Sequence, residues 1–207
     1  MVAGVLSACG AWCGSTVPGD ETNPKGFFEH TIIREQIVKP MLTQIGADTS
    51  GVVSLPPLKL NMTVPKLDQY LGDIIAGDGY DGQQPWLYKD AKLSLLWPAF
   101  DAAFPEACWI IVRRNVDRVI DSCLNTPFMK QHSVDRAFWH QFATAYQERL
   151  DALNKTVKHS VTLDVESIFQ GDSRPLKTIL PQCGLRHDQL AIDLLVDRRH
   201  WHYPDKP

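Results

Sequence analysis

The chain of 207 residues has no apolar run long enough to cross a membrane and no excess of basic charge. Lys and Arg total 21 and Asp and Glu total 24, which gives a formal net charge of −3. This balance argues against broad nucleic-acid binding, although it is compatible with a local basic pocket. The missing apolar run argues against a membrane span. With 44% hydrophobic and 22% charged residues, we expect one globular domain over residues 1–207.

The chain also lacks a set of cysteines that could form a metal site or a disulfide framework. Cys9 and Cys13 lie four residues apart, but no second close pair completes a zinc site. Five scattered cysteines in a chain of this length favour reduced, mostly buried thiols and therefore a cytoplasmic protein. His200 and His202 resemble a metal-ligand pair, but no third ligand matches them, so we expect a surface loop and no metal.

Apolar periodicity predicts strands that alternate with helices. Repeats of three and four residues predict helices over 2–9, 31–45, 64–76, 91–104, 116–124, 134–157 and 175–183. Residues 108–112 form a continuous apolar run, which is typical of a strand buried on both faces, and residues 161–165 alternate as a second strand. Glycine and proline predict loops over 11–27, 46–62 and 77–85. The alternation predicts an α/β fold with a parallel sheet.

The strand over 108–112 leads directly into polar residues that suit an anion. Ligands of open parallel sheets bind beyond the carboxyl ends of the strands. Asn115 is a good N-cap there, and the first amides of its helix favour negative charge. Arg114 offers a planar cation for phosphate, and Ser122 follows two helical turns later. The spacing therefore indicates a phosphate site, and the alternative is an arginine that closes a strand and a serine on a solvated face.

The segment Arg114-Asn115-Val116-Asp117-Arg118, with Ser122 after it, resembles the sulfotransferase pattern R-N-P-x-D-x-x-x-S. Val116 replaces the usual proline and Arg118 the common aspartate, and neither change removes an anion ligand. Residues 23–30 resemble the N-P-K-G-[FY]-[FW]-E run of bacterial-type sulfotransferases. Residues 88–93 resemble W-K-D-P-R-L, and residues 163–185 resemble the late strand and helix of the family. The likeness spans nearly the whole chain.

The resemblance implies a three-layer, P-loop-like fold with a mostly parallel sheet flanked by helices. It also implies transfer of a sulfuryl group from 3′-phosphoadenosine 5′-phosphosulfate to a hydroxyl or amine of a small-molecule or carbohydrate acceptor, without a metal. In the family, the positions of Arg114 and Ser122 hold the 3′-phosphate of the donor, next to the N-cap Asn115.

The resemblance also suggests catalytic roles. Glu29 is the candidate general base, with His30 as the alternative. Lys89 would stabilise the leaving phosphate oxygen, and Asp90 would orient the acceptor. Two simpler interpretations stay open, namely a salt bridge between Lys89 and Asp90 and a Glu29 carboxylate that complements a helix dipole.

The first strand of the family and its R-S-G-T-[ST] loop have no clear counterpart. The helix over 2–9 would follow that loop, which would then lie before Met1. The internal candidate, residues 13–16, is followed by Pro18 and Gly19, which would interrupt the helix such a loop must enter. We expect a chain that lacks this strand, with unpaired core edges and low stability or activity. A non-catalytic binding or scaffold domain therefore stays open. A nucleotide or small-molecule kinase is disfavoured, because no G-x-x-x-x-G-K-[ST] occurs and the acidic strand end that would bind magnesium is missing.

Overall fold

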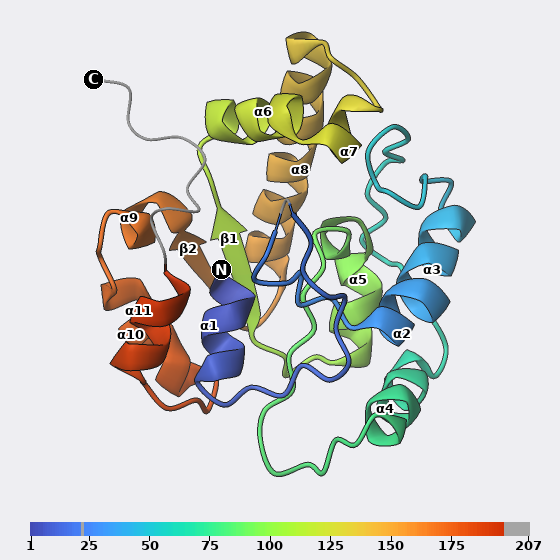
Figure 1. Cartoon of the computed structure of the whole chain (residues 1–207). Coiled ribbons are helices and arrows are strands. Elements are labelled where there is room, and N and C mark those ends of the chain that lie inside the picture. The colour runs from blue at the N-terminus through green and yellow to red at the C-terminus, as the bar shows by residue number, and fades with distance from the viewer. Residues whose placement is uncertain (22, 197–207) are drawn as a thin grey trace.

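A computed structural model describes residues 1–21 and 23–196, most of them in helices (Figure 1). His200 and His202 lie outside the described residues. No helix in the described residues is long and apolar enough to span a membrane. The described elements are, in chain order, α1 (Val2–Ala8), α2 (Thr31–Ile33), the π-helical turn η1 (Arg34–Val38), α3 (Lys39–Gln44), α4 (Leu67–Gly77), α5 (Leu93–Ala103), β1 (Trp109–Arg113), α6 (Val116–Asn125), α7 (Pro127–Lys130), α8 (Arg136–Thr156), β2 (Ser160–Asp164), α9 (Val165–Phe169), α10 (Arg174–Gln182) and α11 (Gln189–Leu195).

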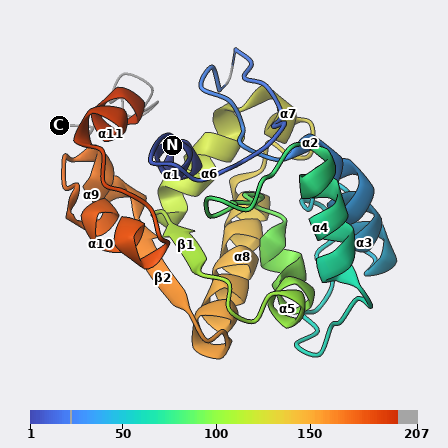
Figure 2. The same ribbon diagram turned by 90° about the horizontal axis from the view of Figure 1, so that it is seen from below.

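β1 and β2 form a two-stranded parallel sheet near the centre of the molecule. Trp109 pairs with Ser160 at one end of the register, and Arg113 pairs with Asp164 at the other. Helices α9, α10 and α11 lie on one side of the sheet, and α5 and α8 lie on the other (Figures 1 and 2). The prediction of an α/β fold with parallel strands between helices is confirmed. The larger sheet of a three-layer sulfotransferase fold stays a prediction, because the sheet in the described residues has two strands.

Successive residues of β1 enter different hydrophobic cores. Ile111 packs with Trp97 of α5 and Leu153 of α8. Ile110 packs against the core that α1 and α10 share with Leu163 of β2. Successive side chains of a strand point to opposite faces, so this alternation places the sheet between two helical layers.

The helices predicted from periodicity are present, with shifted ends. α4 begins at Leu67 rather than near residue 64, because Lys66 has a left-handed backbone with φ 59°. η1 interrupts the helix predicted over 31–45 shortly before Pro40, which has no N–H to continue the regular hydrogen-bond ladder. Helices α7 and α9 were not predicted, because four and five residues are too few to show a period. The seven-residue α11 was not predicted because its apolar residues do not share one face: Ile192 is buried, whereas Leu190 and Leu194 are exposed.

Both predicted strands exist, but the first is not buried on both faces. Ile111 is buried, whereas Val112 is 41% exposed. An apolar run indicates that a segment avoids water without showing how many neighbours cover it, and among residues 1–21 and 23–196 only β2 pairs with β1. The second strand ends at Asp164, because the Asp164 carboxylate accepts a hydrogen bond from the Glu166 amide and caps α9.

The loop over residues 46–62 is ordered by one carboxylate. Asp48 Oδ1 accepts hydrogen bonds from the backbone amides of residues 52–54 at 2.8 to 3.0 Å. The Tyr146 hydroxyl of α8 donates to the Gly51 carbonyl at 2.6 Å and fastens the same loop to the helical layer. The loop therefore has a defined shape without regular secondary structure.

The stability of this loop is expected to depend on pH through Asp48. Burial raises the pKa of Asp48, but hydrogen bonds from Ser50, Ser54 and residues 52–53 outweigh it and lower the pKa to about 2. A lowered pKa stabilises the folded chain fully above the ordinary value of 3.8, and this stabilisation is lost as the pH falls towards 2. Urea titrations measure the free energy of unfolding at pH 5 and at pH 2. Between these two pH values the wild type should lose about 1–2 kcal/mol more of this free energy than Asp48→Asn, after allowance for solvent screening.

The matched control for this titration is Asp73→Asn, since Asp73 is an exposed residue of α4. This variant should keep the pH dependence of the wild type. Equal losses in Asp48→Asn and the wild type would show that Asp48 has no such role.

Candidate functional site

Glu29, Lys89 and Asp90, the three catalytic candidates, lie in one cluster of charged side chains. Lys89 Nζ donates to Glu29 Oε1 at 3.0 Å. Lys92 Nζ lies 2.7 Å from Asp90 Oδ1 and 3.7 Å from Glu29 Oε2, so it contacts both carboxylates. Lys89 therefore pairs with Glu29, whereas the ion pair that the sequence suggested for Lys89 and Asp90 is made by Lys92. We call Glu29, Arg34, Tyr88, Lys89, Asp90 and Lys92 the charge cluster.

Two segments that are distant in sequence bring this cluster together. Glu29 directly precedes His30, the N-cap of α2. Lys89 and Asp90 follow an extended segment that forms a parallel bridge through Trp86 and directly precede the turn into α5. Asp90 Oδ1 accepts from the Lys92 amide at 2.9 Å, which fixes the carboxylate at this turn.

The cluster joins buried carboxylates to a more accessible cation. The side chain of Asp90 is fully buried, whereas that of Lys89 is 40% exposed. Arg34 Nη1 adds a third cation at 3.7 Å from Glu29 Oε2. Burial and the neighbouring Asp90 carboxylate raise the pKa of Tyr88, so its hydroxyl stays a donor to Asp90 Oδ2 at 3.0 Å. Lys89 is therefore the cluster cation best placed to meet a solute.

The start of α1, marked N in Figure 1, lies near Lys89 and Lys25. Burial lowers the pKa of the Met1 amino group, and the charges of Lys89 and Lys25 lower it further. Lys25 Nζ also donates to the carbonyl oxygens of Leu194 and Leu195 at 3.1 and 3.2 Å. Two lysines from separate loops thus concentrate positive charge at the start of this helix.

His30, the alternative base, is built into the fold. Its side chain is 1% exposed, and its Nδ1 accepts from the Ile33 amide at 3.4 Å. Its Nε2 lies 3.2 Å from Asp78 Oδ2. Both ring nitrogens of His30 therefore face partners within the chain, as both oxygens of Glu29 do, and the two candidate bases are alike in this respect.

The internal loop over residues 13–16 is occupied by a carboxylate. The Ser15 hydroxyl donates to Asp78 Oδ1 at 2.6 Å, and the Ser15 amide donates to Asp78 Oδ2 at 2.5 Å. These hydrogen bonds lower the pKa of Asp78. Gly14 has φ +63°, and a Cβ there would lie 2.5 Å from Asp78 Oδ2. The Ser15 amide is therefore bonded to Asp78, where a phosphate loop would direct it at its ligand.

The proposed phosphate residues begin at the carboxyl end of β1. Asn115 Oδ1 accepts from the Arg118 amide at 3.3 Å, so Asn115 is the N-cap of α6, as predicted. Burial raises the pKa of Cys123 to about 11, and the nearby charge of Arg114 acts in the opposite direction. Arg114 therefore acts electrostatically on the second turn of α6, where half-buried Ser122 precedes Cys123.

A carboxylate that the sequence analysis did not select lies at the start of α6. Glu166 Oε1 and Oε2 accept from the Asn115 amide at 3.3 and 3.2 Å, and Glu166 Oε1 lies 3.7 Å from Arg114 Nε. Burial and a hydrogen bond with Asp164 raise the pKa of Glu166. An anion at this helix start would have to replace Glu166 or share Arg114 with it.

The described thiols and carboxylates form no evident metal centre. Within residues 1–21 and 23–196, no three His, Cys, Asp or Glu side chains gather as metal ligands. Cys108 and Cys183 are free thiols with their sulfur atoms 3.7 Å apart. Both line an apolar cleft.

Comparisons of the chain with protein-family models, curated proteins and solved structures gave no match. Interpretation of the site therefore depends on the chemistry of its residues.

Proposed function

We propose that this protein is a sulfotransferase-like enzyme that transfers a sulfuryl group from 3′-phosphoadenosine 5′-phosphosulfate to a hydroxyl or amine of a small-molecule or carbohydrate acceptor. The observation that carries this proposal is the charge cluster. Glu29 and Lys89 are 60 positions apart, and their side chains form a direct ion pair. The position of Arg114 and Asn115 beyond the carboxyl end of β1 gives further support.

In this proposal, the charge cluster carries out the transfer. The acceptor hydroxyl gives its proton to Glu29, and its oxygen forms a bond to sulfur. The bond between sulfur and the bridging phosphate oxygen breaks, and its electron pair stays on that oxygen, beside Lys89. The Asp90 side chain is fully buried and held by Tyr88 and Lys92, so it keeps the start of α5 in place rather than orienting the acceptor directly. Arg114, Asn115 and Ser122 would hold the 3′-phosphate.

Nucleotide selectivity tests this function directly. Isothermal titration calorimetry should show saturable binding of adenosine 3′,5′-bisphosphate, at least about tenfold tighter than that of adenosine 5′-monophosphate, because only the former has a 3′-phosphate for Arg114. Equal affinities for the two nucleotides would contradict the 3′-phosphate assignment.

Glu166→Gln is expected to strengthen binding of adenosine 3′,5′-bisphosphate about fivefold, equivalent to about 1 kcal/mol. The substitution removes a negative charge from the start of α6 and keeps the size of the side chain. The change should be measured by calorimetry beside Glu148→Gln, an exposed position of α8 that should leave the affinity unaltered. Unchanged or weaker binding by Glu166→Gln would show that its carboxylate does not compete with the nucleotide.

A non-catalytic binding domain of the same fold is the second candidate. The observation that favours it is the loop over residues 13–16, where the Ser15 amide binds Asp78. Transfer from donor labelled with ³⁵S distinguishes the two candidates. Labelled product that requires Lys89 supports the enzyme, whereas nucleotide binding without labelled product supports the binding domain.

A further inference from the structure

One edge of β1 faces away from β2. The Trp109 amide donates to the His159 carbonyl at 2.9 Å, and Trp109 is in register with Ser160. In a parallel pair, alternate residues bond to the same neighbour, so Ile110 and Val112 turn their N–H and C=O groups away from β2. Within the described residues, these groups have no hydrogen-bond partner on that side.

A second open edge belongs to residues 85–88. The Trp12 amide donates to the Pro85 carbonyl at 2.9 Å, and the Leu87 amide donates to the Trp12 carbonyl at 2.8 Å. By the same alternation, Trp86 and Tyr88 turn their backbone groups away from Trp12. No described residue pairs with the Trp86 or Tyr88 amide.

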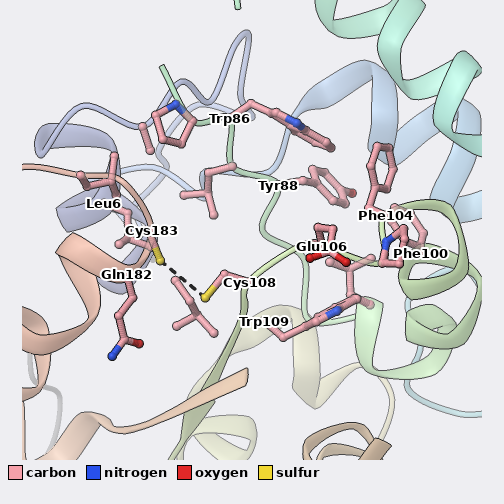
Figure 3. Close-up of a pocket in the computed structure, with 18 of the residues that line it drawn as sticks. Leu6, Trp86, Tyr88, Phe100, Phe104, Glu106, Cys108, Trp109, Gln182 and Cys183 are labelled. Carbon is pink, nitrogen blue, oxygen red and sulfur yellow. Dashed lines mark hydrogen bonds between the residues drawn. The ribbon is translucent and has the colours of Figure 1, made fainter. Parts of the chain in front are cut away.

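An apolar cleft of about 620 Å³ separates these two segments. In Figure 3, Trp86 and Tyr88 lie on one wall and Cys108 and Trp109 on another, and Ile110 also contributes to the lining. Side chains from helices and their C-caps close the cleft on both faces of the sheet, with Leu6 and Cys183 on one face and Phe100 and Phe104 on the other. The cleft is thus a gap in the sheet layer of the fold.

The backbone N–H and C=O groups of the two walls that lack a partner among the described residues indicate which kind of ligand the cleft binds. A cleft of this volume suits a small ligand or a peptide segment equally well. An apolar small molecule, however, would cover the walls and leave backbone N–H and C=O groups buried without partners, which is costly. An extended peptide satisfies one wall with alternate residues and the other wall with the residues between them.

We propose that this cleft is the docking site for one extended apolar strand of another polypeptide, which pairs with β1 and with residues 86–88. The added strand joins the two segments into one larger sheet. This interaction goes beyond sulfuryl transfer and rests on the cleft alone, so it does not require the proposed function.

The test uses the full chain and a capped peptide, acetyl-Lys-Val-Ile-Val-Ile-Val-Lys-amide. Maleimide alkylation of Cys108, which lines the cleft, is followed by mass spectrometry with and without the peptide. We expect the peptide to slow alkylation of Cys108 at least tenfold in a saturable manner. Cys123, a buried thiol outside the cleft, is the internal reference and should react at the same rate in both samples.

Matched peptides separate strand pairing from simple apolar binding. Two versions with N-methyl groups on alternate residues keep the side chains and remove the amide donors that face one wall or the other. Neither should protect Cys108. If an N-methylated peptide protected Cys108 as well as the parent peptide does, the cleft would bind apolar groups without strand pairing, and the proposal would be wrong. It would also be wrong if the parent peptide gave no saturable protection of Cys108. A dimer of the chain in sedimentation that the peptide dissociates would assign the cleft to a second copy instead.

Discussion

Asp90→Ala is expected to lower the free energy of unfolding by about 3–5 kcal/mol, because it removes one partner of a buried ion pair. The Asp90 side chain is fully buried and accepts hydrogen bonds from the Lys92 amide and the Tyr88 hydroxyl, besides its ion pair with Lys92. The variant would leave Lys92, whose side chain is 13% exposed, with the more distant Glu29 carboxylate. Urea denaturation followed by circular dichroism measures the change.

The control for Asp90→Ala is Asp73→Ala, which truncates the same side chain at an exposed position of α4. It should change the free energy of unfolding by less than about 0.5 kcal/mol. A loss below about 1 kcal/mol in Asp90→Ala would show that the charge cluster contributes little to the stability of the fold.

Arg114→Ala is expected to weaken binding of adenosine 3′,5′-bisphosphate about 30-fold, which corresponds to about 2 kcal/mol for the loss of a charged hydrogen-bond donor. Arg114 lies beside the amide of Asn115, the N-cap of α6, and shares Glu166 with it. Its removal would leave the nucleotide facing the Glu166 carboxylate without a compensating guanidinium. Calorimetry at constant ionic strength gives the change, since phosphate binding weakens as salt increases.

Arg113→Ala is a close control for Arg114→Ala, because it removes the same charge one position earlier in the chain. The Arg113 guanidinium is directed at α8, where it donates to Gln147 and Asp151 at 2.5 Å. Binding by this variant should stay within about twofold of the wild type. If both variants lost affinity equally, the effect of Arg114 would be one of general charge and the 3′-phosphate assignment would be wrong.

Sequence periodicity predicted the helices well because each long helix buries one regular stripe. α6 shows this in Ile120 and Cys123, and α8 in Trp139 and Ala143, all of them buried. The exposure of Val112 could not be predicted in the same way, because it depends on a neighbouring strand rather than on the local sequence.

The site was predictable where spacing along one segment determines position. The N-cap role of Asn115 follows from the sequence because cap and amide are three residues apart. The contacts of Glu166 with Asn115 and of Asp78 with Ser15 could not be predicted, because they join residues 51 and 63 positions apart. Such contacts arise from tertiary packing, and periodicity carries no signal for them.

The parallel pairing of β1 with β2 also has a consequence for the order in which the chain folds. Trp109 and Ser160 are 51 positions apart, and α6, α7 and α8 lie between the two strands. Helices form from local contacts, whereas a parallel pair must first overcome the entropy of closing the whole intervening segment. We therefore expect α8 to form early and to position β2 beside β1. The sheet at the centre of the molecule would then be among the last parts to assemble.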